Sequence, residues 1–273
     1  MIESGPPSGP RLVSGSPPQE NPVAHVRHLG NDVVDLTSPR SMDPTPRPRF
    51  LQRVLHPEEG AVVAASPDPR LALWLIWAGK EAIFKSTTKA QGHPPVFHHP
   101  RFRVSFAPHT LATLSPSSPT EAGGPLLSGS GRYERFSFMI RARVTSAHIH
   151  ALAWLEESGG RPEPEVVWAV VREEESPAWG SPADPLEPRF TPGEWGCVSH
   201  RYSALTRLAA REALSRSLGV EERRLEIRCG PGDPGRRVPL VFLDQEPAPV
   251  DLTLSHDGPV LAWAFLPYRP QGR

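Results

Sequence analysis

The stretch from Leu71 to Ser86, LALWLIWAGKEAIFKS, places a carboxylate and an ammonium on or beside the apolar face of a predicted amphipathic helix. Residues three or four apart are neighbours on a helix, so Glu81 lies beside Trp77 and Lys85 lies one turn beyond Glu81. A carboxylate beside tryptophan is costly to desolvate unless it meets a cation, a metal ion or hydrogen-bond donors. Glu81 is therefore a candidate metal ligand or general base. The alternative is an ordinary surface Glu–Lys pair, which contributes about 0.2–0.5 kcal/mol.

Composition limits the partners and the compartment. The chain has 273 residues, enough for one large domain or two smaller ones, and its 30 basic residues balance 30 acidic ones. This balance gives no reason to expect a nucleic-acid or membrane partner, and no apolar run approaches the ~20 residues of a membrane span. The two cysteines, Cys197 and Cys229, form neither a disulfide framework nor a zinc pattern. We therefore expect a reduced, cytoplasmic location.

The prolines cluster and divide the chain. We expect a disordered Pro/Gly/Ser-rich tail, a first half with an acidic strand (GNDVVDL) and the Trp-rich helix, a Pro-rich linker, and a second half that ends in a Ser-His hairpin. These parts cover residues 1–25, 26–172, 173–196 and 197–273. The first half also contains strand-like runs such as EVVWAVV, and residues 115–132 are expected to form a flexible insertion.

The Trp-rich helix has a counterpart in the second half. WAGKEAIFKS (77–86) aligns without a gap with LAAREALSRS (208–217), so that Glu81 matches Glu212. The same alignment pairs Lys80 with Arg211 and Lys85 with Arg216. Chance similarity between two Ala/Glu/Arg helices is the alternative. We favour duplication, which predicts an α+β pseudo-dimer of two helix-plus-antiparallel-sheet halves.

The two halves differ in the residues that could do chemistry. Only the first has an acidic strand, which carries Asp32, and only the second ends in Ser255-His256. A single site at the interface of the halves would combine Asp32 and Glu81 with His256. Two carboxylates from separate elements suit Mg²⁺, and a lysine one turn away, Lys85, can hold a phosphate or transition-state charge. This arrangement predicts metal-assisted chemistry on a phosphate ester.

In their order along the chain, these motifs resemble those of the 4′-phosphopantetheinyl transferase superfamily. The resemblance covers roughly residues 29–86 and 202–266. Its motifs are Gly30-Asn31-Asp32, the helix from Trp77 to Lys85 with Lys80-Glu81-Ala82, the segment from Arg49 to Glu59, and Leu254-Ser255-His256.

The resemblance implies transfer of the phosphopantetheine arm of coenzyme A to a serine of an acyl or peptidyl carrier protein, as in holo-acyl-carrier-protein synthases. It assigns Asp32 and Glu81 to Mg²⁺, the attacking serine's proton to Glu81, and charge stabilisation to Lys85. Coenzyme A would be contacted by Lys80, Ser255 and His256. Because the chain would already be a pseudo-dimer, we expect a monomer.

The sequence departs from the superfamily pattern at several positions. Val34 stands where larger members often have a second acid, Asn31 replaces an aliphatic residue, and Ser-His follows the Lys-Glu-Ala helix instead of preceding it. A non-catalytic module that binds coenzyme A or a carrier protein is therefore the alternative function. A metal pair at His148 and His150, and a coenzyme A contact in the His-rich loop (93–100), are weaker candidates, for which structural or solvated roles are favoured.

Overall fold

The computed structural model describes residues 28–43, 47–107, 111, 126–156, 163–175, 183–230 and 238–267. The expected disordered tail lies outside these residues. Helices pack on antiparallel sheets throughout the described part, which confirms the predicted α+β class. Across the same residues, every helix is too short or too polar to span a membrane.

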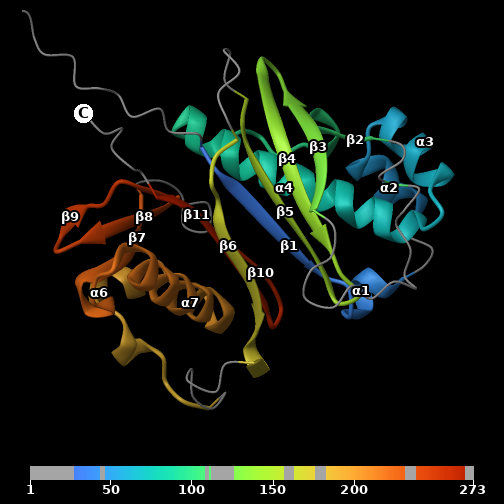
Figure 1. Ribbon diagram of the computed structural model, residues 1–273. Helices are drawn as coiled ribbons and strands as arrows, with labels where there is room; N and C mark the ends of the chain where they lie inside the picture. The colour runs from blue at the N-terminus through green and yellow to red at the C-terminus, as the bar shows by residue number, and fades with distance from the viewer. Residues whose placement is uncertain are drawn as a thin grey trace, which may run out of the picture.

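The first unit is a long helix packed on a five-stranded sheet with the order β1-β5-β4-β3-β2, in which all neighbours are antiparallel (Figure 1). Its strands are β1 (Gly30–Asp35), β2 (Arg103–Phe106), β3 (Leu126–Tyr133), β4 (Phe136–Val144) and β5 (His148–Leu155). The other helical segments of this unit are short and follow β1 in the chain: α1 (Pro39–Met42), α2 (Pro48–Val54), α3 (Pro57–Ala65) and the 3₁₀ turn η1 (His99–Arg101).

The long helix, α4 (Pro69–Gln91), contains the Trp-rich stretch and has clear ends. The Asp68 carboxylate accepts the N–H of Leu71 at 2.9 Å, and Gly92 ends the helix with a φ of 72°. Strand β1 lies directly on this helix, since a Cβ on Gly30 would be 2.0 Å from the carbonyl oxygen of Ala82. This close approach brings the acidic strand beside Glu81 and Lys85.

The second unit packs α7 (Arg201–Leu218) against strands from the C-terminal part of the chain. One sheet has the order β10-β11-β6, and a smaller sheet has the order β7-β8-β9, with β8 lying against β10. The strands are β6 (Val167–Arg172), β7 (Leu225–Cys229), β8 (Pro239–Leu243), β9 (Glu246–Pro247), β10 (Val250–Asp257) and β11 (Val260–Pro267). The short helical segments are α6 (Pro192–Trp195), η2 (Glu173–Glu175), η4 (Glu187–Arg189) and η5 (Glu222–Arg224).

Two features differ from the sequence-based expectations. The strand Val167–Arg172, which we placed in the first half, pairs with β11 of the second unit. The segment expected to be a flexible insertion (115–132) also contributes most of a strand, β3. The sequence did not indicate this strand, because Gly129 and Gly131 have low strand propensity. These glycines are required by packing, since a Cβ would lie 2.7 Å from Phe106 and 2.2 Å from Ile83, respectively.

A buried ion pair fastens the long helix of the first unit to the elements around it. Lys80 of α4 lies 2.6 Å from Glu59, the third residue of α3. The Glu59 carboxylate also accepts the backbone N–H groups of His56, at 2.7 Å, and of Val104 in β2, at 2.8 Å. One carboxylate thus joins a helix start, a strand and the long helix.

The second unit repeats this arrangement. Arg211 of α7 lies 3.2 Å from Glu194, the third residue of α6. The Glu194 carboxylate accepts the N–H groups of Thr191 and of Ile227 in β7, both at 3.0 Å. Lys80 and Arg211, which are matched in the sequence alignment, therefore occupy equivalent structural positions.

The two units meet where β1 lies beside β10 and β11, near the centre of the molecule (Figure 1). Separate apolar clusters fill each unit around α4 and α7, and smaller clusters, such as Val33 with Val260 and Ala262, lie between them. The cleft described next opens at this interface.

Candidate active site

A cleft of about 490 Å³ lies at the interface of the two units. The first unit contributes Asp32 from β1 and Glu81 and Lys85 from α4, while the second contributes Ser255 and His256 from β10. The structure thus brings five of the six predicted site residues into one cleft. The second unit also supplies Gly196, Cys197, Val198, Ser199, Ser203, Thr206, Arg207, Cys229, Pro239 and Leu254.

Asp32 is the most deeply buried carboxylate of the cleft. Its Oδ1 accepts hydrogen bonds from the Ser255 hydroxyl at 2.8 Å and from the Lys85 ammonium at 3.2 Å. Burial, opposed by Lys85 and Ser255 and reinforced by the neighbouring Glu81 charge, raises the pKa of Asp32 to about 6. Negative charge at this point is therefore incompletely balanced by the protein, and a bound cation would favour the ionised carboxylate.

Lys85 lines the cleft and connects the two units. Its ammonium donates to the carbonyl oxygens of Asn31, at 2.7 Å, and of Leu254, at 3.3 Å, as well as to Asp32. Its side chain nevertheless keeps 29% of its surface exposed. The charge is thus fixed in place and still open to a ligand.

Glu81 lies on the next turn of α4, with a side chain 21% exposed. The His99 Nε2 atom is 3.6 Å from its carboxylate. The His99 ring lies near Trp77 and Phe97, with centroid distances of 4.6 and 4.1 Å. From the sequence we expected His99 to be a solvated loop residue. In the structure its imidazole lies beside the Glu81 carboxylate.

His256 lines the cleft from the second unit. Its ring meets that of His200 edge-on, with centroids 4.6 Å apart. Burial, followed by the charges of His200, Lys85 and Arg207, lowers the pKa of His256 to about 4. His256 is therefore neutral near pH 7.

Residues 28–124 match the family model of the 4′-phosphopantetheinyl transferase superfamily. The match confirms the resemblance found from the motifs, and it indicates phosphopantetheine transfer as the general class of chemistry. It includes Asp32, Glu81 and Lys85, whereas Ser255 and His256 lie beyond it. No curated protein matches the chain.

Lys80 does not lie in the cleft, contrary to the coenzyme A contact expected from the superfamily resemblance. Its side chain is fully buried, and its ammonium donates to the carbonyl oxygens of His99, at 3.1 Å, and Phe102, at 2.5 Å, in addition to pairing with Glu59. Adjacent helical residues point about 100° apart, so Lys80 and Glu81 face different surroundings. Lys80 therefore has a structural role.

The sequence did not predict several residues of the second unit that line the cleft. Arg207 of α7 donates to the Ser203 hydroxyl at 2.7 Å and to its carbonyl oxygen at 3.0 Å, and it adds a cation to the cleft. Cys197 and Cys229 of the second unit also line the cleft, and burial together with Cys229 raises the pKa of the Cys197 thiol to about 11. No local pattern reveals these residues, because the tertiary fold brings α7 and the end of β7 together.

Of the two histidines on β5, His150 is engaged in a buried hydrogen bond away from the cleft. His150 is buried, and its Nε2 lies 3.3 Å from Asn31 Nδ2, so it accepts a hydrogen bond from that amide. Asn31 Oδ1 in turn accepts the Thr253 hydroxyl at 2.9 Å. The unusual Asn31 thus joins β5 to β10, and burial lowers the pKa of His150 to about 3.

The donor set of the cleft fits magnesium. Among the described residues, no group of three or more His, Cys, Asp and Glu side chains is arranged to hold a metal ion. Mg²⁺, however, typically uses only one or two protein carboxylates and completes its shell with water and substrate phosphates. Asp32, whose charge the protein balances incompletely, and the neighbouring Glu81 meet that requirement.

Proposed function

We propose that this protein transfers the 4′-phosphopantetheine arm of coenzyme A to a serine of an acyl or peptidyl carrier protein in a Mg²⁺-dependent reaction. The observation that supports this most is the meeting of Asp32, Glu81 and Lys85 with Ser255 and His256 in one cleft. Lys85 and Arg207 make the cleft suitable for a phosphate-bearing substrate.

We further infer that the two units form a pseudo-dimer. Strand β6 corresponds to β1, and the order β6-β11-β10, with β8 and β7 beyond, parallels β1-β5-β4-β3-β2. The equivalent buried pairs of Lys80 and Arg211 support the same correspondence. In the second copy of the helix, α7, the side chains of Glu212 and Arg216 are exposed. They form an ion pair with each other across one helical turn, at 3.3 Å. The duplicated scaffold therefore carries a single site.

The residues of the cleft divide the chemistry among them. Asp32 and Glu81 would hold Mg²⁺, which when bound neutralises charge on the pyrophosphate of coenzyme A. Glu81 accepts the proton of the carrier serine as its oxygen forms the new bond to phosphorus. As the bond to the bridging pyrophosphate oxygen breaks, Lys85 stabilises the charge on the departing adenosine 3′,5′-bisphosphate.

The test is to incubate the protein with coenzyme A, Mg²⁺ and a panel of apo carrier proteins, and to measure the phosphopantetheine mass gain on the carrier. Glu81→Gln is expected to lower kcat by about 10²- to 10⁴-fold through loss of the general base. Glu212→Gln, at the matched position of the exposed helix copy, is the control and should transfer at the parent rate. Transfer by Glu81→Gln at the parent rate would refute the mechanism. Coenzyme A binding without transfer to any carrier would favour the non-catalytic binding module.

A further inference from the structure

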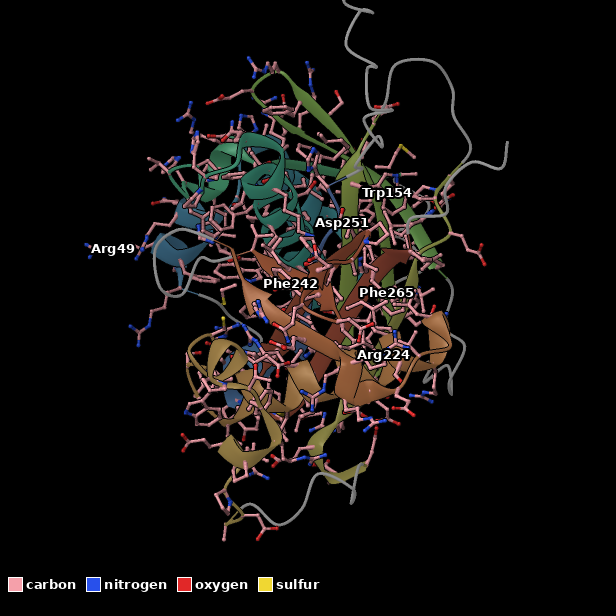
Figure 2. The ribbon with its side chains drawn as sticks, turned by 90° about the vertical axis from the view of Figure 1, so that its left-hand side faces the viewer. Arg49, Trp154, Arg224, Phe242, Asp251 and Phe265 are labelled. Atoms are coloured by element: carbon pink, nitrogen blue, oxygen red, sulfur yellow. The ribbon has the colours of Figure 1, made fainter. Side chains whose placement is uncertain are left out.

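Strand β1 is at the edge of its sheet, yet alternate N–H groups from Leu29, just before it, to Asp35 are satisfied across the interface. They donate to side-chain oxygens of alternate residues on β10, in a set we call the β1–β10 ladder. Its rungs are Leu29 to Asp251 (2.6 Å), Asn31 to Thr253 (3.2 Å), Val33 to Ser255 (3.3 Å) and Asp35 to Asp257 (3.0 Å). Figure 2 labels Asp251, the first of these acceptors, near the middle of the view.

Ser255 makes a hydrogen bond to a cleft carboxylate that the other acceptors of the ladder do not make. Its hydroxyl accepts the Val33 N–H and donates its own proton to Asp32 Oδ1 at 2.8 Å. The Thr253 hydroxyl makes the corresponding bond to the amide of Asn31, which does not line the cleft. Ser255 is thus the rung that connects the ladder to a cleft carboxylate.

The orientation of Asp32 follows from these contacts. The hydrogen bonds from Ser255 and Lys85 both end on Oδ1, so this oxygen is held by the protein. Ser255 is itself buried and is fixed by the backbone of β1. Side chains that hold a metal ligand from behind set its orientation, and their loss typically weakens metal binding by about 10- to 100-fold.

We propose that Ser255 is a positioning residue that holds Asp32 for a divalent cation, instead of the coenzyme A contact expected from the superfamily resemblance. This inference rests on the proposed function, because the cation is the Mg²⁺ of that reaction. The β1–β10 ladder then has two roles. It fixes the register of the two units, and through Ser255 it orients the Asp32 carboxylate that would bind the cation.

The experiment compares Ser255→Ala with Thr253→Val, which removes a hydroxyl from the neighbouring rung. Mn²⁺ binding to the full chain, without coenzyme A, is measured by electron paramagnetic resonance, and urea unfolding reports stability. Both variants should lower the urea midpoint, because each leaves a buried N–H unpaired. Only Ser255→Ala should weaken Mn²⁺ binding, by about 10-fold or more. In the transfer assay it should raise the Mg²⁺ concentration for half-maximal rate and leave the KM for coenzyme A unchanged.

The results separate this inference from the proposed function. Parent-like Mn²⁺ affinity in Ser255→Ala, or an equal loss in Thr253→Val, would overturn the positioning role. Mn²⁺ binding that depends on Asp32 and Ser255 without any transfer would support the positioning role and reject the proposed reaction. A parent protein whose Mn²⁺ binding is unaffected by Asp32→Asn would overturn the positioning role and remove the metal assignment on which it rests.

Discussion

Replacing Lys80 with methionine tests whether this lysine has a structural role or binds a phosphate of coenzyme A. The superfamily resemblance placed Lys80 at coenzyme A, whereas the structure pairs it with Glu59 at 2.6 Å and buries it completely. Methionine keeps an apolar stem of similar length and removes the ammonium. Lys80→Met should therefore reduce stability and leave coenzyme A binding unchanged.

The size of the effect follows from the contacts of Glu59. Breaking a buried ion pair by removing one partner costs about 3–5 kcal/mol, because the other charge stays buried. Glu59 keeps the N–H groups of His56 and Val104, which offset part of the loss, so we expect the lower limit of about 3 kcal/mol. With roughly 2–4 °C per kcal/mol for a chain of this size, the melting temperature should fall by about 6–12 °C.

The assay combines thermal unfolding followed by circular dichroism with a titration of coenzyme A. Glu59→Gln combined with Lys80→Met removes both charges and should recover part of the lost stability. Arg211→Met, at the equivalent position of α7, should also lower the melting temperature. Weaker coenzyme A binding by Lys80→Met at an unchanged melting temperature would refute the structural role and restore the phosphate contact.

Two further predictions concern β1 and its neighbours. In Gly30→Ala, the new Cβ would lie 2.0 Å from the Ala82 carbonyl oxygen, so the strand must move off α4. Both the urea midpoint and the transfer rate should fall, and an unchanged midpoint would contradict the close packing. For His150, burial lowers the pKa from 6.5 to about 3, so the unfolded chain takes up the proton first and stability is lost as pH falls from 6.5 towards 3. His150→Gln should flatten this part of the urea midpoint's pH profile, and an equally steep profile would contradict a buried neutral imidazole.

The sequence predicted the fold best where apolar periodicity is strong. The helix expected over the Trp-rich stretch forms as part of α4, which continues past Ser86 to Gln91. Strand β3 was missed because its glycines are selected by contact with Phe106 and Ile83, which only the folded chain reveals. Strand β6 was placed in the wrong unit, because strand propensity does not specify a pairing partner.

The sequence also predicted some features of the candidate site and missed others. Residue types and motif order selected Asp32, Glu81 and Lys85, which the structure brings together. The buried partner of Lys80 could not be predicted, because Glu59 lies on a different helix. The alternating polar residues of β10 were visible in VDLTLSHD, but such a pattern usually marks a solvent-facing side of a strand. Here that side is buried, with Thr253 and Ser255 only 2% and 6% exposed, because it pairs with β1.

The contacts of Lys85 and Lys89 explain why the helix pattern alone could not identify the site. Each ammonium binds one carbonyl oxygen from β1 or the residue just before it, one from β10, and one carboxylate. The carbonyl pairs are offset by two residues along both strands. Lys89 binds Leu29 (2.6 Å), Leu252 (2.7 Å) and Asp251 (2.5 Å), and Lys85 binds Asn31 (2.7 Å), Leu254 (3.3 Å) and Asp32 (3.2 Å). The Lys89 side chain is closed off, at 7% exposed, whereas that of Lys85 is 29% exposed and faces the cleft. The same structural unit thus occurs twice along the interface, and the copy that opens to solvent, beside Glu81, is the one in which a fixed lysine can also meet a phosphate.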